Sequence, residues 1–203
     1  MKKLIAFAAL LVVAASFCFA DFKVKISDEL DCVVHNHEVF TSYLSTKNGI
    51  PYVVTWTVTN AEVLAENVKR KDAFKKCGCS LDKSYKGTRW QGRDRGHMCP
   101  CDDKNDSEEK QKTTFLMCNM VPQTPQMNRK TWLALEKKTR ELAKHYHKVE
   151  VASGPIYEVN GDIISCFKVV RYFGKTRCWI CFDTFSRDSS LEEIERLTGI
   201  KIY

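Results

Sequence analysis

Residues 90–100 read WQGRDRGHMCP, which places two arginines, an aspartate and a histidine around a glycine. A histidine near its ordinary pKa of about 6.5 can accept a proton at neutral pH. Arginine binds phosphate oxygens through forked hydrogen bonds, and glycine lets the backbone approach a ligand closely. The stretch therefore contains the residue types that hydrolysis of a phosphodiester requires, although an ordinary surface turn can contain them too.

A helix is predicted downstream, over residues 129–147, from its composition and periodicity. Asn128 stands at the expected N-cap position. Asn128, Trp132, Glu136 and Arg140 are each four residues apart, so they form one slowly drifting stripe on the helix. Three polar side chains could then face one cleft, with Trp132 packed between them. In the alternative interpretation, Asn128 is only a cap, and Glu136 and Arg140 form an ordinary i,i+4 ion pair.

The other segments predict one mixed α and β domain, of the α+β class with a mainly antiparallel sheet. Runs rich in β-branched and aromatic residues predict strands at 33–34, 52–59, 113–121, 149–157, 163–172 and 179–183. Residues 61–75 are partly helical in pattern, and 76–92 suggest a loop tied by disulfides. Residues 101–112 are interpreted as an exposed connection with a short helix starting near Ser107. A capping box at 189–193 predicts a last helix, ended by Gly199.

The first twenty residues have the pattern of a secretory signal peptide, with a basic start, an apolar centre and a small residue, Ala20, at the exit. The apolar run is too short for a membrane span. Cleavage there would leave a domain at 21–203, exported to the periplasm or outside the cell, with no membrane association. It would lower the formal net charge from +7 to +5. That moderate excess fits a polyanionic partner without proving one.

Ten cysteines are present, nine of them after residue 20. An exported protein with this many is expected to form disulfides, whose pairing the sequence does not give, and an odd number leaves at least one thiol. Zinc binding is the alternative, but the spacings do not fit a regular finger. The pairs concerned are Cys77-Gly-Cys79, Cys99-Pro-Cys101 and Cys178-x-x-Cys181. His35 and His37 alternate on one strand face, which favours a surface strand over a metal site.

Taken together, the motifs resemble those of the DNA/RNA non-specific endonucleases, of the His-Me finger (ββα-metal) superfamily. The resemblance rests on DRGHMCP at 94–100, TFLMCNMVPQ at 114–123 and NRKTWLALEKKTR at 128–140, with SGPIY at 153–157, FKVV at 167–170 and IERLTG at 194–199. It implies a ββα-metal finger active site and an exported endonuclease, monomeric or homodimeric, that cleaves DNA and RNA with little sequence preference. The implied cofactor is Mg²⁺, for which Mn²⁺ can substitute.

The resemblance also implies roles for the residues that match its motifs. His97 would be the general base, Asn128 the protein ligand of one Mg²⁺, and Glu136 the acceptor for its bound waters. Because Mg²⁺ keeps most of its waters, a single amide ligand is reasonable. Arg95 and Arg140 would bind the charge that develops on the phosphate, and Asn119 would orient His97. Arg70, Arg93 and Asp94 complete the set as substrate-binding residues.

Cysteines around the motifs depart from the family pattern. Cys99 and Cys101 flank Pro100, and Cys118 directly precedes Asn119. A disulfide that braces the active-site walls is expected, in preference to thiols that modulate activity. Two other functions stay open: a nucleic-acid-binding protein that has lost catalysis, and a cysteine-rich secreted zinc protein.

Overall fold

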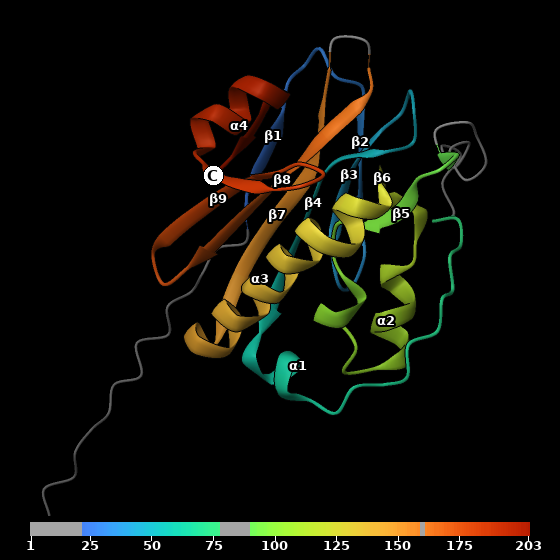
Figure 1. The fold of residues 1–203 in the computed structure, drawn as a ribbon, viewed down its shortest axis with the longest axis vertical. Coiled ribbons are helices and arrows are strands. Elements are labelled where there is room, and N and C mark those ends of the chain that lie inside the picture. Colours follow the sequence, from blue (N-terminus) through green and yellow to red (C-terminus); the bar gives the residue numbers. More distant parts are fainter. Residues whose placement is uncertain (1–21, 78–89, 159–160) are drawn as a thin grey trace, which may run out of the picture.

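A seven-stranded antiparallel sheet forms the centre of the computed structural model, which describes residues 22–77, 90–158 and 161–203 (Figure 1). The expected signal peptide, Cys79 and Asn160 lie outside these residues. The strand order is β10-β9-β8-β7-β4-β3-β2. The strands are β2 (Cys32–Asn36), β3 (Thr41–Ser45), β4 (Pro51–Thr59), β7 (Lys148–Tyr157), β8 (Ile163–Tyr172), β9 (Lys175–Cys181) and β10 (Ser186–Ser189).

These strands confirm most of the predicted ones, because the runs of β-branched and aromatic residues do form the sheet. Side chains alternate between its two faces, and both faces are buried in the middle. On β8, Val170 packs in one apolar cluster and Val169 in another. The strand predicted at 179–183 begins earlier, at Lys175.

Different elements cover the two faces. Helix α3 (Leu133–Tyr146) contacts β4, β7 and β8 on the face that carries Val170. Helix α4 (Leu191–Thr198) and the two-stranded sheet of β1 (Val24–Ile26) and β11 (Ile200–Ile202) cover the other face. In Figure 1, α3 crosses the long strands and α4 lies beside β1, near the C-terminus. None of the helices in the described residues is long and apolar enough to cross a membrane.

A separate two-stranded sheet lies beside the start of the helix that contains α3 (Figure 1). Strand β5 (Asp94–His97) pairs antiparallel with β6 (Met120–Gln123). The strand predicted at 113–121 is therefore wrong over most of its length: α2 (Glu108–Thr114) and a 3₁₀ turn, η4 (Met117–Asn119), precede β6. An apolar run marks burial and does not separate a strand from a buried turn. Pro122 is tolerated inside β6 because a two-stranded sheet has only edge strands.

The helix predicted at 129–147 begins earlier than expected. Thr124 accepts a hydrogen bond from the Met127 N–H at 3.1 Å, and helical structure starts at Pro125. Threonine followed by proline is a normal cap and first position. A π-helical turn, η5 (Met127–Trp132), then leads into α3. Asn128 lies inside that turn, so its interpretation as the N-cap is wrong.

Two connections also differ from expectation. Helix α1 (Asn60–Leu64) ends far short of residue 75, because the following backbone bonds to other segments: Val68 N–H donates to the Asn105 carbonyl at 2.9 Å. The connection at 101–112 is exposed only in part: Cys101 and Asp103 of the 3₁₀ turn η3 (Cys101–Asp103) are buried, as is Lys104, whereas Asp102 is exposed. The predicted helix ends hold, with Ser107 capping α2, Ser190 capping α4 and Gly199 left-handed at φ 71°.

Candidate active site

A cavity of about 320 Å³ lies where β5, the π-turn and α3 meet the extended arm after α1. His97, Asn128 and Glu136 line it, together with three arginines, of which Arg70 and Arg95 are predicted site residues. An adjoining hollow shares those arginines and Asn128, and adds Arg93 and Asp94. Seven of the nine predicted site residues are thus brought to one surface, while Asn119 and Arg140 lie behind its wall.

His97 ends β5 with its side chain in an aromatic enclosure. It is 8% exposed, its ring lies edge-on to Phe115 at 4.7 Å, and Phe74 lies 5.8 Å away. Burial lowers the pKa of His97 to about 3; the charge of Arg70 acts in the same direction, and that of Asp72 opposes it. The imidazole is therefore neutral at neutral pH. Its Nε2 atom is buried and has no hydrogen-bond partner in the described part of the chain, so it can accept a proton.

Asn119 fixes the backbone directly after His97. Its Oδ1 accepts from the Cys99 N–H at 2.8 Å, and its Nδ2 donates to the carbonyls of Cys99 and Thr114, both at 2.8 Å. Its own carbonyl accepts from the Met98 N–H at 2.9 Å. A fully buried amide with these bonds holds β5 in place and acts on His97 through the main chain.

The amide of Asn128 is oriented by Asp94. Its Nδ2 donates to Asp94 Oδ2 at 3.0 Å, which leaves its Oδ1 as an acceptor for another group. Arg129 donates twice to the same carboxylate, at 2.8 and 2.9 Å, and these bonds hold the pKa of Asp94 below its ordinary value. Asp94 thus positions Asn128, and its assignment to substrate binding stays a prediction. Arg129 also lines the cavity, and the sequence analysis missed it.

Glu136 and Arg140 are adjacent on α3 but do not form the alternative i,i+4 pair. Arg140 donates to Asp103 Oδ1 at 2.9 Å and lies 3.8 Å from Asp102. It therefore faces the buried η3 turn, and it is absent from the residues described as lining the cavity. Burial raises the pKa of Glu136 to about 7, while the charge of Lys168 counteracts this rise. The sequence analysis missed Asp103 and Lys168, since a charged loop and a strand residue give no signal of burial.

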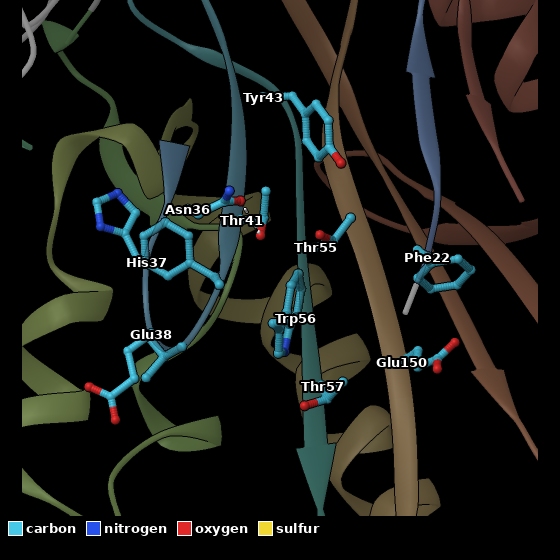
Figure 2. Close-up of a pocket in the computed structure, with 12 residues that line it drawn as sticks. Phe22, Asn36, His37, Glu38, Thr41, Tyr43, Thr55, Trp56, Thr57 and Glu150 are labelled. Atoms are coloured by element: carbon cyan, nitrogen blue, oxygen red, sulfur yellow. Dashed lines mark hydrogen bonds between the residues drawn. The ribbon is translucent and has the colours of Figure 1, made fainter. Parts of the chain in front are cut away.

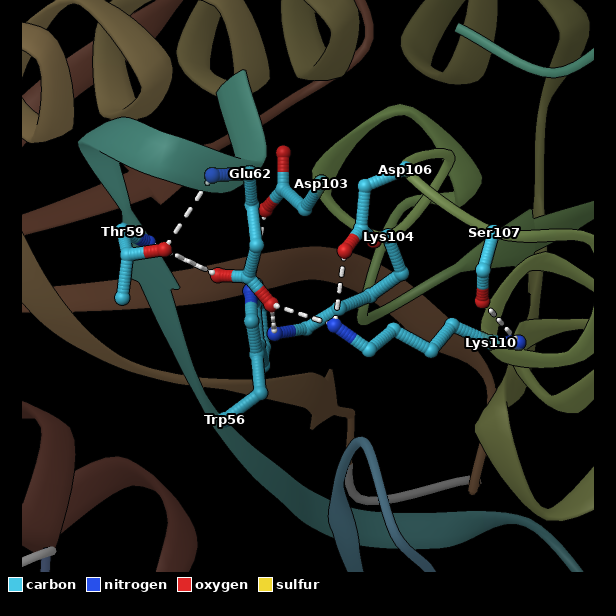
Figure 3. Close-up of polar contacts among 8 residues, drawn as sticks. All are labelled: Trp56, Thr59, Glu62, Asp103, Lys104, Asp106, Ser107 and Lys110. Carbon is cyan, nitrogen blue, oxygen red and sulfur yellow. Dashed lines mark hydrogen bonds and ion pairs between the residues drawn. The ribbon is translucent and has the colours of Figure 1, made fainter. Parts of the chain in front are cut away.

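The wall behind Asp103 is a network of polar contacts (Figure 3). Asp103 Oδ2 accepts from the Trp56 indole N–H at 2.9 Å. Lys104 is paired with Glu62 at 2.6 Å, and both side chains are largely buried. Buried charges are tolerated only when they are paired and hydrogen-bonded. These contacts therefore fix the carboxylate of Asp103, which lies next to the cavity.

The arginines of the cavity rest on aromatic rings. The guanidinium of Arg70 lies 5.5 Å from the centre of the Phe115 ring and pairs with Asp72 at 2.9 Å. That of Arg95 lies 4.9 Å from the centre of the Phe74 ring. Such contacts hold a cation in place over the ring.

The predicted disulfide brace is wrong for the two cysteines that flank Pro100. Cys99 and Cys101 are buried free thiols, and burial raises the pKa of Cys101 to about 12, which keeps that thiol protonated. Cys118 lies 3.3 Å from His37 Nε2. No group of three or more His, Cys, Asp or Glu side chains suited to a metal is found in residues 22–77, 90–158 and 161–203, which gives the zinc interpretation no support.

A second cavity, of about 300 Å³, lies between β2, β3, β4 and Phe22 (Figure 2). Glu38 and Glu150 line it beside uncharged polar residues such as Thr55 and Tyr43, and no lysine or arginine is among its described lining residues. An acidic surface repels nucleic acid, so the basic cavity beside His97 is the candidate site.

Comparison with known proteins decides the family. The model of the DNA/RNA non-specific endonuclease family matches residues 21–177. The chain belongs to this family. Among solved structures, a chain of the EndoG/EndoGI complex superposes with a TM-score of 0.64 at 23% identity, over 82% of this chain and 84% of that one, which confirms the fold.

Curated relatives match over shorter segments. A nuclease of Nostoc sp. is 45% identical over 32% of this chain, and human mitochondrial endonuclease G is 36% identical over 36%. The mitochondrial nuclease EXOG of Xenopus laevis is 33% identical over 50% of this chain. The matched segments span only 23%, 24% and 28% of those three proteins.

Proposed function

We propose that this protein is an exported, Mg²⁺-dependent endonuclease that hydrolyses DNA and RNA with little sequence preference. The observation that carries the proposal is the buried, neutral imidazole of His97, whose Nε2 has no hydrogen-bond partner among the described residues. His97 shares its cavity with Asn128, Glu136 and three arginines. Family membership supports the same reaction class. Export rests on the pattern of residues 1–20.

His97 is proposed as the general base. Its Nε2 would take a proton from a water molecule as the water oxygen bonds to phosphorus, and the bond from phosphorus to the 3′ oxygen would break. The leaving oxygen would then take up a proton from solvent. Arg70 and Arg95 would bind the charge that develops on the phosphate oxygens, since both stand at the cavity on aromatic supports.

The oxygen donors of the cavity fit a hard cation. The Asn128 amide is turned with its nitrogen toward Asp94, so its oxygen is the atom left for a ligand, and the Glu136 carboxylate lines the same cavity. Few protein ligands suit Mg²⁺, which keeps several waters and binds through substrate phosphate, and Mn²⁺ accepts the same donors. When bound, the ion would neutralise the phosphate and stabilise the leaving 3′ oxygen.

Low sequence preference is proposed because the described lining of the cavity includes three arginines, which suit the phosphate backbone. Arginine contacts to the backbone position a nucleic acid without carrying sequence information. DNA and RNA share that backbone. Binding should weaken as salt rises, because counterion release then contributes less.

A digestion assay tests the proposal directly. The purified protein should degrade plasmid DNA and RNA in Mg²⁺ and stop in EDTA. His97→Ala should lower the rate by roughly 10²- to 10⁴-fold, as expected for loss of a general base, without changing the thermal midpoint greatly. The matched control is His145→Ala, an exposed histidine of α3, which should stay active. Robust cleavage by His97→Ala would remove the assigned base, and an inactive wild-type protein that still binds DNA would indicate a binding module.

A further inference from the structure

We propose that Lys168 is a positioning residue of the active site, one that holds the supports of His97 and Asp103 through two indole rings. This inference rests on the proposed function and deepens it. Lys168 lies in the middle of β8, on the face that α3 covers, and its side chain is fully buried. It belongs to no element that carries a predicted site residue, and the reaction outlined above gives it no role.

The surroundings of Lys168 are unusual for an ammonium group. Its Nζ lies 4.3 Å from the centre of the Trp132 ring and 5.0 Å from that of Trp56. It has no hydrogen-bond partner among the residues that the structure describes. Burial of an ammonium is unfavourable unless other groups compensate, so an apolar side chain of similar length would pack here at lower cost.

Each of the two indole rings contacts Lys168 through its face and donates a hydrogen bond to a residue of the candidate site or its wall. The Trp132 indole N–H donates to the His97 carbonyl at 3.0 Å, and Trp132 is fully buried. The Trp56 indole N–H donates to Asp103 at 2.9 Å, as Figure 3 shows. The Lys168 ammonium, held between two indole ring faces, therefore restrains both indole N–H groups. One of them donates to the backbone carbonyl of His97, the proposed base, and the other donates to the carboxylate of Asp103.

Charge points to the same role. Burial lowers the pKa of Lys168. The carboxylates of Glu136 and Asp103 and the nearby Cys99 thiol counteract this effect and favour the charged form, whereas Arg140 opposes it. Arg140 is already bonded to Asp103. Lys168 has a larger compensating effect on the buried Glu136 than Arg140 has, and Glu136 is the residue proposed to hold metal-bound water. Partners of this kind, one step behind the reacting groups, orient them and affect metal affinity or rate by about 10- to 100-fold.

Lys168→Met separates a positioning role from a purely structural one. Because methionine fills a similar volume without a charge, the thermal midpoint should hold or rise. The kcat for plasmid DNA should fall about 10- to 100-fold with KM little changed, and the increase in thermal midpoint that Mg²⁺ causes without nucleic acid should shrink. The matched control is Arg171→Met on the same strand and opposite face, where the guanidinium lies 4.2 Å from the Phe22 ring centre and donates to Glu150.

Each outcome decides the inference. Loss of kcat in Lys168→Met, with normal kcat in Arg171→Met, supports it. Wild-type kcat and a wild-type Mg²⁺ shift in Lys168→Met overturn it. If Lys168→Met loses its folded state, Lys168→Gln is measured in its place, and a folded, fully active glutamine variant overturns the inference equally. Failure of the proposed function is separate, since it would appear as a wild-type protein that cleaves no nucleic acid.

Discussion

The two faces of the central sheet bury cations of the same strand in different ways. On one face, Arg171 packs on Phe22 and pairs with Glu150 at 3.3 Å, and its side chain keeps 22% of its exposure. On the other face, Lys168 is fully buried between two tryptophans, without a hydrogen bond in the described part of the chain. An ordinary folded domain needs only the first arrangement. The second arrangement, a buried charge without a hydrogen bond, is energetically unfavourable, and such groups are concentrated at functional sites.

The same contrast holds for the elements that cover the sheet. Helix α4 and the β1–β11 pair close their face mainly with apolar side chains such as Ile194, Ile200 and Ile202. The other face buries Asn119, Asp103 and His97 together with its apolar cluster. Stability should therefore depend on both faces, whereas nucleic-acid cleavage should depend on only one.

The largest expected effect is on the active-site face. Asn128→Ala removes the amide oxygen proposed as the metal ligand, and we expect kcat/KM in Mg²⁺ to fall by about 100-fold or more. The Mg²⁺-induced rise in thermal midpoint should disappear at the same time. Both are measured on plasmid DNA and by thermal unfolding without nucleic acid.

Asn36→Ala is the control for that substitution. Asn36 lines the second cavity, and its Oδ1 accepts from Thr41 at 3.1 Å. Its loss should leave cleavage and the Mg²⁺ shift unchanged. Equal losses in the two variants would mean that the faces are not functionally distinct.

Much of the fold could be predicted because its signals are local. Runs such as 52–59 and 163–172 form strands through their own residue types, and Ser190 and Gly199 set the ends of α4 through their own backbone bonds. The π-turn was missed because Thr124-Pro125 begins the helix one turn before the predicted cap. The arm after α1 was missed because its hydrogen bonds go to residues such as Asn105, far along the chain.

The candidate site was predictable in part for the same reason. His97, Asn128 and Glu136 belong to motifs of fixed spacing, and the structure brings them to one cavity. The residues behind them depend on pairs far apart in sequence: Trp56 with Asp103, and Trp132 with the His97 carbonyl. Nothing around Lys168 in the sequence indicates that a lysine is buried there. Burial of charge is decided by tertiary partners, which one sequence does not display.

A smaller effect is expected on the stability of the protein in acid, and it should come from the face of the sheet that carries the active site. The pKa of His97 is about 3 in the folded state, against about 6.5 when unfolded, so the unfolded state binds more protons between those values. The free energy of unfolding should therefore fall as pH drops from about 6.5 toward 3, by at most about 5 kcal/mol from this residue. His97→Gln should flatten that dependence, as measured by urea unfolding at several pH values.

Glu136→Gln should change the pH dependence of the free energy of unfolding in the opposite direction. Burial raises the pKa of Glu136 to about 7, so the folded state binds more protons between about 4.3 and 7, and the wild type loses stability as pH rises through that range. The glutamine variant should lack this loss. A His97→Gln variant as acid-sensitive as the wild type would contradict the neutral, buried imidazole.

The smallest effect should come from the end of α4, on the face without catalytic groups. The Ser190 hydroxyl accepts a hydrogen bond from the Glu193 N–H at 3.2 Å, which satisfies one of the open donors of the first turn. Ser190→Ala should lower the free energy of unfolding by about 1 kcal/mol. When kcat and KM on plasmid DNA are measured well below the unfolding transition, they should match the wild-type values. The reason is that Ile194, the buried residue of α4, packs in the apolar cluster on the face of the sheet opposite the active-site cavity. A cap mutation that reduced kcat in the folded protein would show that α4 transmits strain through the sheet, and the separation of the two faces would then fail.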